Sequence, residues 1–295
     1  MSFSRFCLNA LLVITCVTSC LAQRQTSVGQ LNLTFTTIDV PGALYTNVSG
    51  INKAGDLVGS YGQNTSNDSH GFVYSNGVFK FFDYPGQTVT VPTSINDFGR
   101  IVGFFVQNPI IGFLFDGNTF TSLQDGTDSA TFCEGINNAG VMVGGAGTIY
   151  TTTGFELRRG VYLPINFPGE YLYGVANGIN NLGQVVGYTI SGTYQNGFIL
   201  TNGKFRNINF PGALETDALG INDKGVVVGW YNPSSQSDYA FILINGRYIS
   251  FSYPGAVATF ATGINTSGQI VGQYTFDYST YHGFVTNPLN FDKPE

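Results

Sequence analysis

Charged side chains are scarce in this sequence of 295 residues, and their scarcity limits the partners that it can bind. Asp, Glu, Lys and Arg together make up 10% of the chain, and the 12 Lys and Arg residues form no basic run. A nucleic-acid-binding protein needs clustered Lys and Arg to displace counterions from phosphates. Nucleic acid is therefore not among the expected partners.

Cysteine is nearly absent from the body of the chain. Of the 4 Cys residues, Cys7, Cys16 and Cys20 lie close to the N-terminus, and only Cys133 lies beyond them. If the N-terminal segment is removed on export, no internal disulfide can form, despite the oxidising environment outside the cytoplasm. Cys133 aligns with Val or Ala in other copies of the repeat described below, which predicts a buried side chain and not a reactive thiol.

Long hydrophobic runs are also missing, because the apolar stretch from Leu8 to Val17 is too short to span a bilayer. With Arg5 in front of it, this stretch is typical of an export signal. Cleavage after Ala22 would release a secreted protein, whereas residues 17–20 resemble a bacterial lipobox in which Cys20 would be lipidated. The sequence leaves both outcomes open, and a membrane partner is expected only if Cys20 is lipidated.

These features divide the chain into four parts. We expect an export signal in residues 1–22, a linker in residues 23–32, the folded domain in residues 33–288 and a C-terminal tail in residues 289–295. A domain of this length can bury a sizeable core without disulfides.

Glycine and aromatic residues, in contrast, are abundant and follow a repeat. The chain has 39 Gly, 25 Phe and 17 Tyr, a composition typical of tight turns that join β-strands. A stretch like that from Gly50 to Gly59 occurs six times. Its Asn recurs at spacings of 44, 41, 43, 42 and 43 residues, at Asn52, Asn96, Asn137, Asn180, Asn222 and Asn265. Such a period is typical of architectures in which each copy is one supersecondary unit.

Each copy of the repeat predicts four short strands. An Asn-x-x-Gly turn joins the first strand to the second, because Asn can bond its own backbone and Gly adopts a positive φ. The second strand contains Val-Gly, and this Gly indicates that a neighbouring backbone or side chain packs closely against it. The third strand begins with Gly-Phe or Ala-Phe and ends in a hairpin turn, and the fourth mostly ends before Pro-Gly.

The two ends of the repeat region predict how the copies are closed. The last copy stops after Gly283-Phe284-Val285 without a fourth strand, whereas an extra fourth strand, Phe35 to Val40, precedes the first Asn. A ring in which the N-terminal strand completes the last blade leaves no exposed edge. We therefore predict an all-β fold, a six-bladed β-propeller of four-stranded blades. The alternative is an open β-solenoid, in which Phe35 to Val40 would not pair with residues 281–287.

The start of the third strand resembles a known repeat. A His/x-Gly/Ala-Phe pattern occurs as His70-Gly71-Phe72, Tyr239-Ala240-Phe241 and His282-Gly283-Phe284, and the other copies replace its first residue with Ile111, Thr153 or Asn196. Together with the Gly-Ile-Asn unit, this pattern resembles the bacterial extracellular repeat family called HAF over about residues 35–287. The resemblance implies export and repetition, and it carries no catalytic residues.

The two His residues are the main candidates for chemistry. His70 and His282 occupy the same repeat position in blades one and six, which are neighbours in a closed ring. With Asp39 and Asp83 they could form a metal or acid–base site, but the favoured interpretation is that each His hydrogen-bonds a loop of its own blade and each Asp caps a turn. Known catalytic and metal motifs are absent, so we assign no catalytic residue, metal or cofactor.

The loops between the second and third strands are expected to form the binding face. The Gly-to-Gly spacing across these loops ranges from nine (Gly103 to Gly112) to twelve (Gly59 to Gly71), and variable loops are suited to recognition. Aromatic residues near the ends of the second strands could stack on a ligand or belong to the core between blades: Tyr61, Phe105, Tyr188, Tyr231 and Tyr274. The single Trp of the chain, Trp230, is the first candidate for a ligand contact, followed by Tyr231, His70 and His282.

These patterns predict an exported, monomeric, non-enzymatic propeller that binds or scaffolds an extracellular protein or glycan through its loop face. The alternative is an extracellular glycan hydrolase or lyase, which would need two carboxylates that converge on one cleft.

Overall fold

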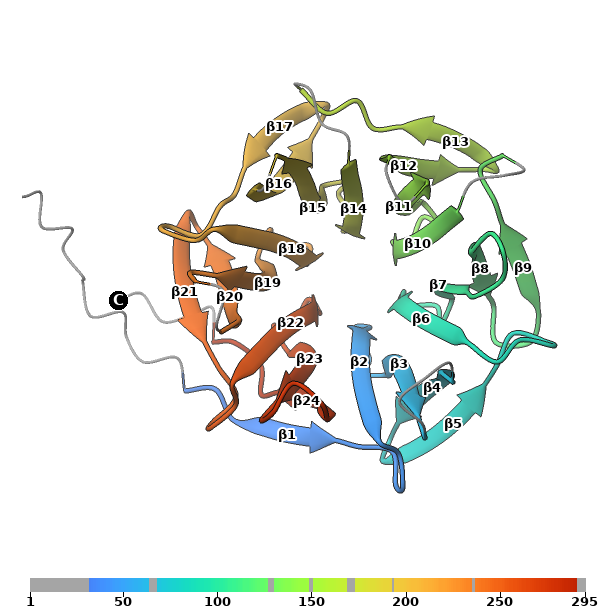
Figure 1. Cartoon of the computed structure of the whole chain (residues 1–295), viewed down its shortest axis with the longest axis horizontal. Helices are drawn as coiled ribbons and strands as arrows, with labels where there is room; N and C mark the ends of the chain where they lie inside the picture. The colour runs from blue at the N-terminus through green and yellow to red at the C-terminus, as the bar shows by residue number, and fades with distance from the viewer. Residues whose placement is uncertain are drawn as a thin grey trace, which may run out of the picture. The chain divides into compact units, whose positions relative to one another are not determined.

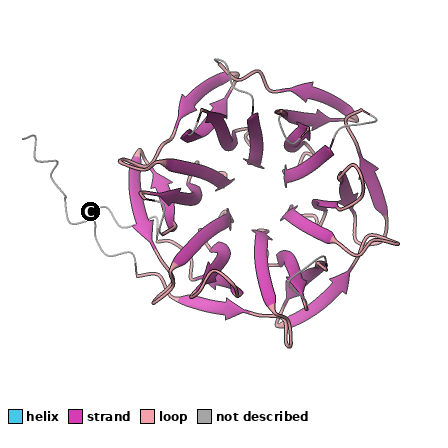
Figure 2. Cartoon of the chain, viewed as in Figure 1, coloured by secondary structure: helices cyan, strands magenta, loops and turns pink. Residues whose placement is uncertain are grey.

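The computed structural model describes residues 32–63, 68–126, 130–148, 151–168, 173–192, 194–234 and 237–290. The expected export signal with Cys20, nearly all of the linker and the end of the C-terminal tail lie outside the described residues. Within the described residues all regular elements are strands, β1 to β24, and there is no helix (Figure 2). No helix that could cross a membrane is present in this part of the chain.

The strands form a ring of six units that follow the sequence repeat (Figure 1). The strands of units 1 to 3 are β2 (Tyr45–Ile51), β3 (Leu57–Gly62), β4 (His70–Ser75) and β5 (Val78–Phe82); β6 (Thr90–Ile95), β7 (Ile101–Phe105), β8 (Ile111–Phe115) and β9 (Phe120–Leu123); and β10 (Ala130–Ile136), β11 (Met142–Gly147), β12 (Thr152–Arg158) and β13 (Val161–Pro164). The strands of units 4 to 6 are β14 (Tyr173–Ile179), β15 (Val185–Ser191), β16 (Tyr194–Thr201) and β17 (Lys204–Asn207); β18 (Glu215–Ile221), β19 (Val227–Asn232), β20 (Tyr239–Ile244) and β21 (Arg247–Phe251); and β22 (Ala258–Ile264), β23 (Ile270–Thr275), β24 (Tyr281–Thr286) and β1 (Phe35–Ile38).

The N-terminal strand β1 is the fourth strand of unit 6. It pairs antiparallel with β24, from Phe35 opposite Thr286 to Ile38 opposite Gly283. The open-solenoid alternative lacks this pairing. The first strand of unit 1, β2, also packs against β22, β23 and β24, so units 1 and 6 are neighbours in the ring.

The sheets differ in one respect from six separate four-stranded blades, because units 3, 4 and 5 are joined into one 12-stranded sheet. The connections are two single parallel pairs, Thr152 with Tyr173 and Gln195 with Glu215. Units 1 and 5 make the same contact with the following unit as isolated bridges. In units 3 and 4 the third strand extends to seven and eight residues, which brings its start within pairing distance of the next inner strand.

A β-bulge recurs in the first strand of every unit. In unit 1 the register between β2 and β3 shifts between Val48 and Gly50, and the same shift occurs at the equivalent place in the other five units. A bulge leaves one residue unpaired and redirects its side chain. Six residues are placed in this way: Ser49, Thr93, Glu134, Asn177, Leu219 and Thr262.

The glycine of the second strand is required by close packing on both sides, as the sequence predicts. A Cβ on Gly59 would lie 2.0 Å from the backbone oxygen of Asn47 and 2.8 Å from the ring of Phe72. The equivalent Val and Phe residues form the core of every unit, and Val58 and Phe72 are both fully buried. Cys133 is also fully buried, in a cluster with Phe155 and Leu157, which confirms its expected place in the core.

Candidate functional site

The six repeated asparagines share one structural role on the side of the ring that carries the tight turns, the turn face, and five of them have a second role. In each unit the Asn Oδ1 atom accepts the backbone N–H four residues later, as from Val141 to Asn137 at 3.0 Å. The turn glycines have positive φ, between 74° and 89°, as the Asn-x-x-Gly pattern predicts. The second role was missed, because Asn137 also donates its Nδ2 hydrogen to the backbone oxygen of Asn180 in the next unit, at 3.2 Å.

This bond between units is repeated around the ring. It joins Asn96 to Asn137, Asn180 to Asn222 and Asn222 to Asn265. Asn265 donates to the backbone oxygen of Asn52 at 3.1 Å, which connects the last unit to the first. Four residues that follow these asparagines form a further set of bonds between units, namely Asp97, Asn138, Asn181 and Asp223. Much of the polar surface around the axis of the turn face is therefore used to hold neighbouring units together.

A second polar ring surrounds the axis of the molecule at the bulge positions. Ser49 donates to the backbone oxygen of Pro92 at 2.6 Å, and Thr93 donates to Cys133 in the same way at 2.6 Å. Equivalent bonds run from Thr262 to Val48 and from Asn177 to Ala218. The side chain in each of these four units donates a hydrogen to a carbonyl of the next unit.

The acid Glu134 occupies the same bulge position in unit 3, where most other units have a hydrogen-bond donor. It lines a cavity of about 100 Å³ on the axis together with Ser49, Thr93 and Asn177. Burial raises its pKa to about 7. An un-ionised carboxyl carries an O–H that can donate as Ser and Thr do, whereas a carboxylate cannot.

A second buried acid, Asp217, lies near Glu134. Asp217 is 6% exposed and accepts a bond from Asn177 Nδ2 at 2.7 Å. Its pKa is raised to about 8, chiefly by burial and then by the charge of Glu134, while bonds from Asn177, Trp230 and Gln195 oppose the shift. Neither acid was a candidate from the sequence. The available signal was that Glu134 is the only acid at a repeat position otherwise held by Ser, Thr, Asn or Leu.

The cavities on the axis are too small for the carbohydrate chemistry that two acids could otherwise perform. Their volumes are about 80 Å³ beside the asparagine ring and about 100 Å³ beside Glu134. Pockets that bind small molecules usually exceed roughly 300 Å³. A wider hollow of about 460 Å³ lies between the turns of units 3 and 4. Its charged side chains, Arg158 and Glu156, bond to each other at 2.6 Å.

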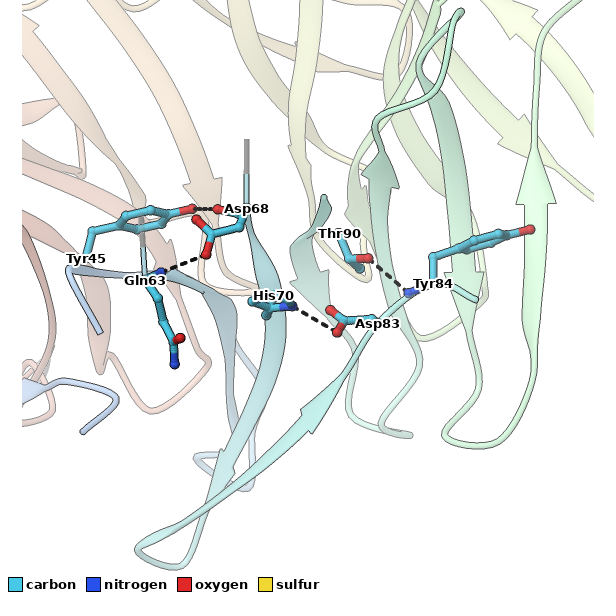
Figure 3. Close-up of polar contacts among 7 residues, drawn as sticks. All are labelled: Tyr45, Gln63, Asp68, His70, Asp83, Tyr84 and Thr90. Carbon is cyan, nitrogen blue, oxygen red and sulfur yellow. Dashed lines mark hydrogen bonds and ion pairs between the residues drawn. The ribbon is translucent and has the colours of Figure 1, made fainter. Parts of the chain in front are cut away.

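Each histidine is paired with an aspartate of its own unit, and Figure 3 shows the pair of His70 and Asp83. His70 Nδ1 lies 2.9 Å from Asp83 Oδ2, and His282 Nδ1 lies 2.8 Å from Asp39 Oδ2. Unit 4 has an amide pair at the same positions, in which Asn209 donates to Asn196 at 2.7 Å. The recurrence of the pair agrees with the local hydrogen-bonding interpretation. Among the described residues, no group of three or more His, Cys, Asp or Glu is placed to hold a metal ion.

The expected turn caps are supplied by threonines, not by the two aspartates. The backbone N–H of Tyr84 donates to Thr90 Oγ1 at 2.9 Å (Figure 3), and that of Val40 donates to Thr46 Oγ1 at 3.0 Å. Both threonines are buried and lie at the start of the inner strand that follows the turn, Thr90 in β6 and Thr46 in β2. This frees the Oδ2 atoms of Asp83 and Asp39 to bond histidine.

The first two aromatic candidates have partners inside the fold. Tyr231 is 8% exposed, stacks on Phe210 at a centroid distance of 3.6 Å, and donates its hydroxyl hydrogen to Ser250. Trp230 is half-buried, hydrogen-bonds Asp217 and packs edge-on against Phe260 of the next unit. Phe105 and Tyr274 are also buried. The structure therefore places Tyr231, Phe105 and Tyr274 in the core, which was the other interpretation of the aromatic residues, whereas Trp230, Tyr61 and Tyr188 are half-buried.

Two exposed aromatic side chains lie in the loop that follows β23. Phe276 is 50% exposed and Tyr278 is 46% exposed, and Val257 in the adjoining loop before β22 is 37% exposed. The Phe276 ring lies 6.3 Å from the His282 ring. This group of Phe276, Tyr278 and Val257, the unit 6 patch, lies on the opposite side from the tight turns, because it is carried by the loops at the other end of the strands.

Comparison with known proteins identifies the fold. No family model and no curated protein sequence matches the chain. Among solved structures, the lectin from Aleuria aurantia, described as a six-bladed β-propeller with a novel fucose recognition mode, matches with a TM-score of 0.53 at 10% identity, over 88% of this chain and 99% of that chain. The β-propeller domain of the Trilobed protease from Pyrococcus furiosus matches with a TM-score of 0.52 at 12% identity, over 86% of each chain.

TolB from Acinetobacter baumannii is also similar, with a TM-score of 0.51 at 10% identity over 84% of this chain, but this chain spans only 55% of the TolB chain. The chain has the β-propeller fold. At these identities the similarity concerns the fold alone, so function has to be argued from the residues.

Proposed function

We propose that this protein is an exported, six-bladed β-propeller, closed by β1, that binds an extracellular protein or glycan through its loop face and catalyses no reaction. The observation that carries the proposal is the group of exposed side chains on the loop face, where Phe276, Tyr278 and Val257 belong to adjoining loops of unit 6. The turn face also exposes Phe98 and Leu182, but these lie in the turns of different units, and its asparagine ring bonds unit to unit.

Three sets of contacts, from the outer edge to the axis, support closure of the ring. At the outer edge β1 pairs with β24. At the bulge ring, Thr262 donates to the backbone oxygen of Val48 at 2.7 Å, and at the asparagine ring Asn265 donates to Asn52. A ring closed in this way is a rigid support for loops, which suits recognition because little ordering is needed on binding.

Export is supported by the N-terminal signal pattern and by the resemblance to HAF repeats, and Cys20 remains the candidate for lipidation. Membership in that family is part of the proposal. In this proposal, the side-chain pairs at the variable first position of the third strand, such as His70 with Asp83, have a local structural role.

Binding is favoured over glycan hydrolysis because the buried acids have no room for a substrate. Glu134 borders a cavity of about 100 Å³, far below the size of pockets that hold small molecules. Its carboxyl and that of Asp217 also have raised pKa values, as the cost of burying charge requires. Both acids are better explained as parts of the interface between units.

The proposal is tested by applying the mature protein to a glycan array and an array of extracellular peptides, while reducing-sugar release is measured on the same glycans. Binding without release is the expected result. Release of reducing sugar would overturn the non-enzymatic assignment, and failure to bind either array would overturn the binding assignment. Loss of binding in Leu182→Ser, beside the hollow on the turn face, but not in loop variants would overturn the choice of face.

A further inference from the structure

The unit 6 patch has the features of a prepared binding site. Phe276 and Tyr278 are half-exposed. Tyr278 has a φ of 60°, one of five non-glycine residues with positive φ in the described ranges. The other four, Asn76, Arg159, Asn202 and Asn245, all lie in hairpin turns between the third and fourth strands. Tyr278 differs from these four because it lies in the longer hairpin loop between β23 and β24, the second and third strands of unit 6.

Hydrogen bonds hold this loop in its conformation. Asp277 Oδ1 accepts the backbone N–H groups of Ser279 and Thr280, both at 2.9 Å. The buried Thr275 Oγ1 accepts the N–H of Tyr278 at 2.9 Å. The bonds from the backbone of Thr280, the largest cause, and of Ser279 favour the charged form of Asp277 and lower its pKa to about 2. The loop therefore keeps its aromatic side chains in place before any ligand arrives, which reduces the entropy lost on binding.

The charges around the patch indicate which ligands it tolerates. The acids whose charges act on Tyr278 and Tyr281 are Asp238 and Asp277, and the other neighbours are tyrosines. Asp39 and its partner His282 lie on the other side, where the Phe276 ring approaches His282. An acidic ligand would meet like charge, whereas hydroxyl groups could donate hydrogens to these carboxylates.

The size of the patch separates a sugar from a protein partner. A stable protein interface buries about 800 Å² on each side and involves roughly 20 to 30 residues. The exposed apolar part of this patch is two aromatic rings and one Val. One or two aromatic faces bordered by hydrogen-bond acceptors match the C–H face and the hydroxyl rim of a pyranose ring.

We propose that the unit 6 patch, formed by Phe276, Tyr278 and Val257 with Asp39 and His282 at its border, binds an uncharged carbohydrate by stacking a sugar ring on Phe276 or Tyr278. This inference rests on the proposed binding function of the loop face, and it names the ligand class and the residues.

The test uses the full-length mature protein and a panel of neutral and uronic-acid-containing oligosaccharides, with affinity measured by calorimetry. Phe276→Ala and Tyr278→Gly are each expected to weaken the binding of neutral sugars by roughly tenfold. Gly accepts the positive φ at position 278, so this second variant removes the ring without adding backbone strain. Tyr194→Ala is the matched control, because Tyr194 is an exposed aromatic residue at the start of β16 in unit 4, and it should bind as the parent does.

Several outcomes would overturn the inference. Tighter binding of acidic than of neutral sugars would contradict the charge argument, and unchanged binding in both patch variants would place the sugar elsewhere. If no sugar binds while a peptide from the array does, the carbohydrate inference fails and the proposed binding function stands. If neither binds, both fail. Unfolding temperatures measured for each variant separate lost binding from lost folding.

Discussion

At the scale of the residue, Asn137 illustrates which contacts a sequence can predict. Its Oδ1 bond to Val141 spans four residues, so the Asn-x-x-Gly pattern is sufficient to predict it. Its Nδ2 bond to Asn180 joins residues 43 positions apart. That bond depends on the rotation between neighbouring units about the axis of the ring, and a local sequence pattern does not encode this rotation. The same limit explains why Glu134 and Asp217 were not candidates, since only the ring brings them together.

The raised pKa of Glu134, which is half-buried beside the axial cavity, leads to a prediction about pH. Its pKa is about 7 in the folded protein and near 4.5 without burial, so the folded state favours the un-ionised form. The unfolded state loses its proton first as pH rises, and the free energy of unfolding should fall between about pH 4.5 and pH 7, by on the order of 3 kcal/mol. Glu134→Gln removes this titration while keeping a donor, as Asn177 does in the next unit.

We therefore expect Glu134→Gln to match the parent near pH 4.5 and to be more stable at pH 8, as measured by denaturant unfolding across this range. Asp217, with a pKa of about 8, still destabilises both proteins as pH rises. Glu134→Ala is the control: it lacks both titration and donor, so it should be less stable than the Gln variant at every pH. A parent and Gln variant with parallel pH profiles would contradict the assignment of the raised pKa to Glu134.

At the scale of the element, the second strand is the part that the sequence predicts best. Its Val-Gly pair recurs because every unit places the same backbone oxygen and the same Phe ring against the Gly. The bulge in the first strand was not predicted, since its residues vary from Ser49 to Leu219 and share no turn-forming type. Bulges are set by how a strand meets its neighbours, and this information lies outside the strand itself.

Two adjacent glycines in β11 provide a test of this packing. A Cβ on Gly144 would lie 1.8 Å from the backbone oxygen of Phe132, whereas a Cβ on Gly145 would first meet the Thr152 Cγ2 atom at 2.8 Å and then Val175 side-chain atoms. Backbone in a paired strand cannot move aside, but a side chain can. Gly144→Ala should therefore lower the free energy of unfolding by more than roughly 3 kcal/mol, and Gly145→Ala by about 1 kcal/mol. Equal losses in thermal or denaturant unfolding would contradict the backbone clash.

At the scale of the whole molecule, the sequence predicts the fold but not the residues that we propose for binding. A missing strand at one end and an extra strand at the other were enough to predict that β1 pairs with β24. Exposure was not predictable in this way. Tyr231 and Phe276 are both aromatic residues near the end of a second strand, yet one is 8% and the other 50% exposed. Tyr231 is covered by Phe210, which stacks on it, and Tyr274, at the same repeat position in unit 6, is covered by Tyr253 in the same way. Phe276 lies two residues beyond that position, in the loop itself.

The position of β1 leads to a prediction about the closure of the ring. Deleting residues 32–40 removes the buried side chains of Ile38 and Val40, each 5% exposed, and leaves the edge of β24 unpaired. The lost burial should cost about 3 to 6 kcal/mol and lower the unfolding temperature by on the order of 10 °C. The open edge should also promote association between molecules, visible by light scattering after size-exclusion chromatography.

A synthetic peptide covering residues 33–42 provides the control for this deletion. Because the ring bonds from Asn265 to Asn52 and from Thr262 to Val48 remain in the shortened chain, the peptide should bind the open edge of β24, raise the unfolding temperature and restore the monomer. A scrambled peptide of the same composition should do neither, since the register places Ile38 opposite Gly283. A shortened chain that is monomeric and as stable as the parent would show that β1 does not close the ring.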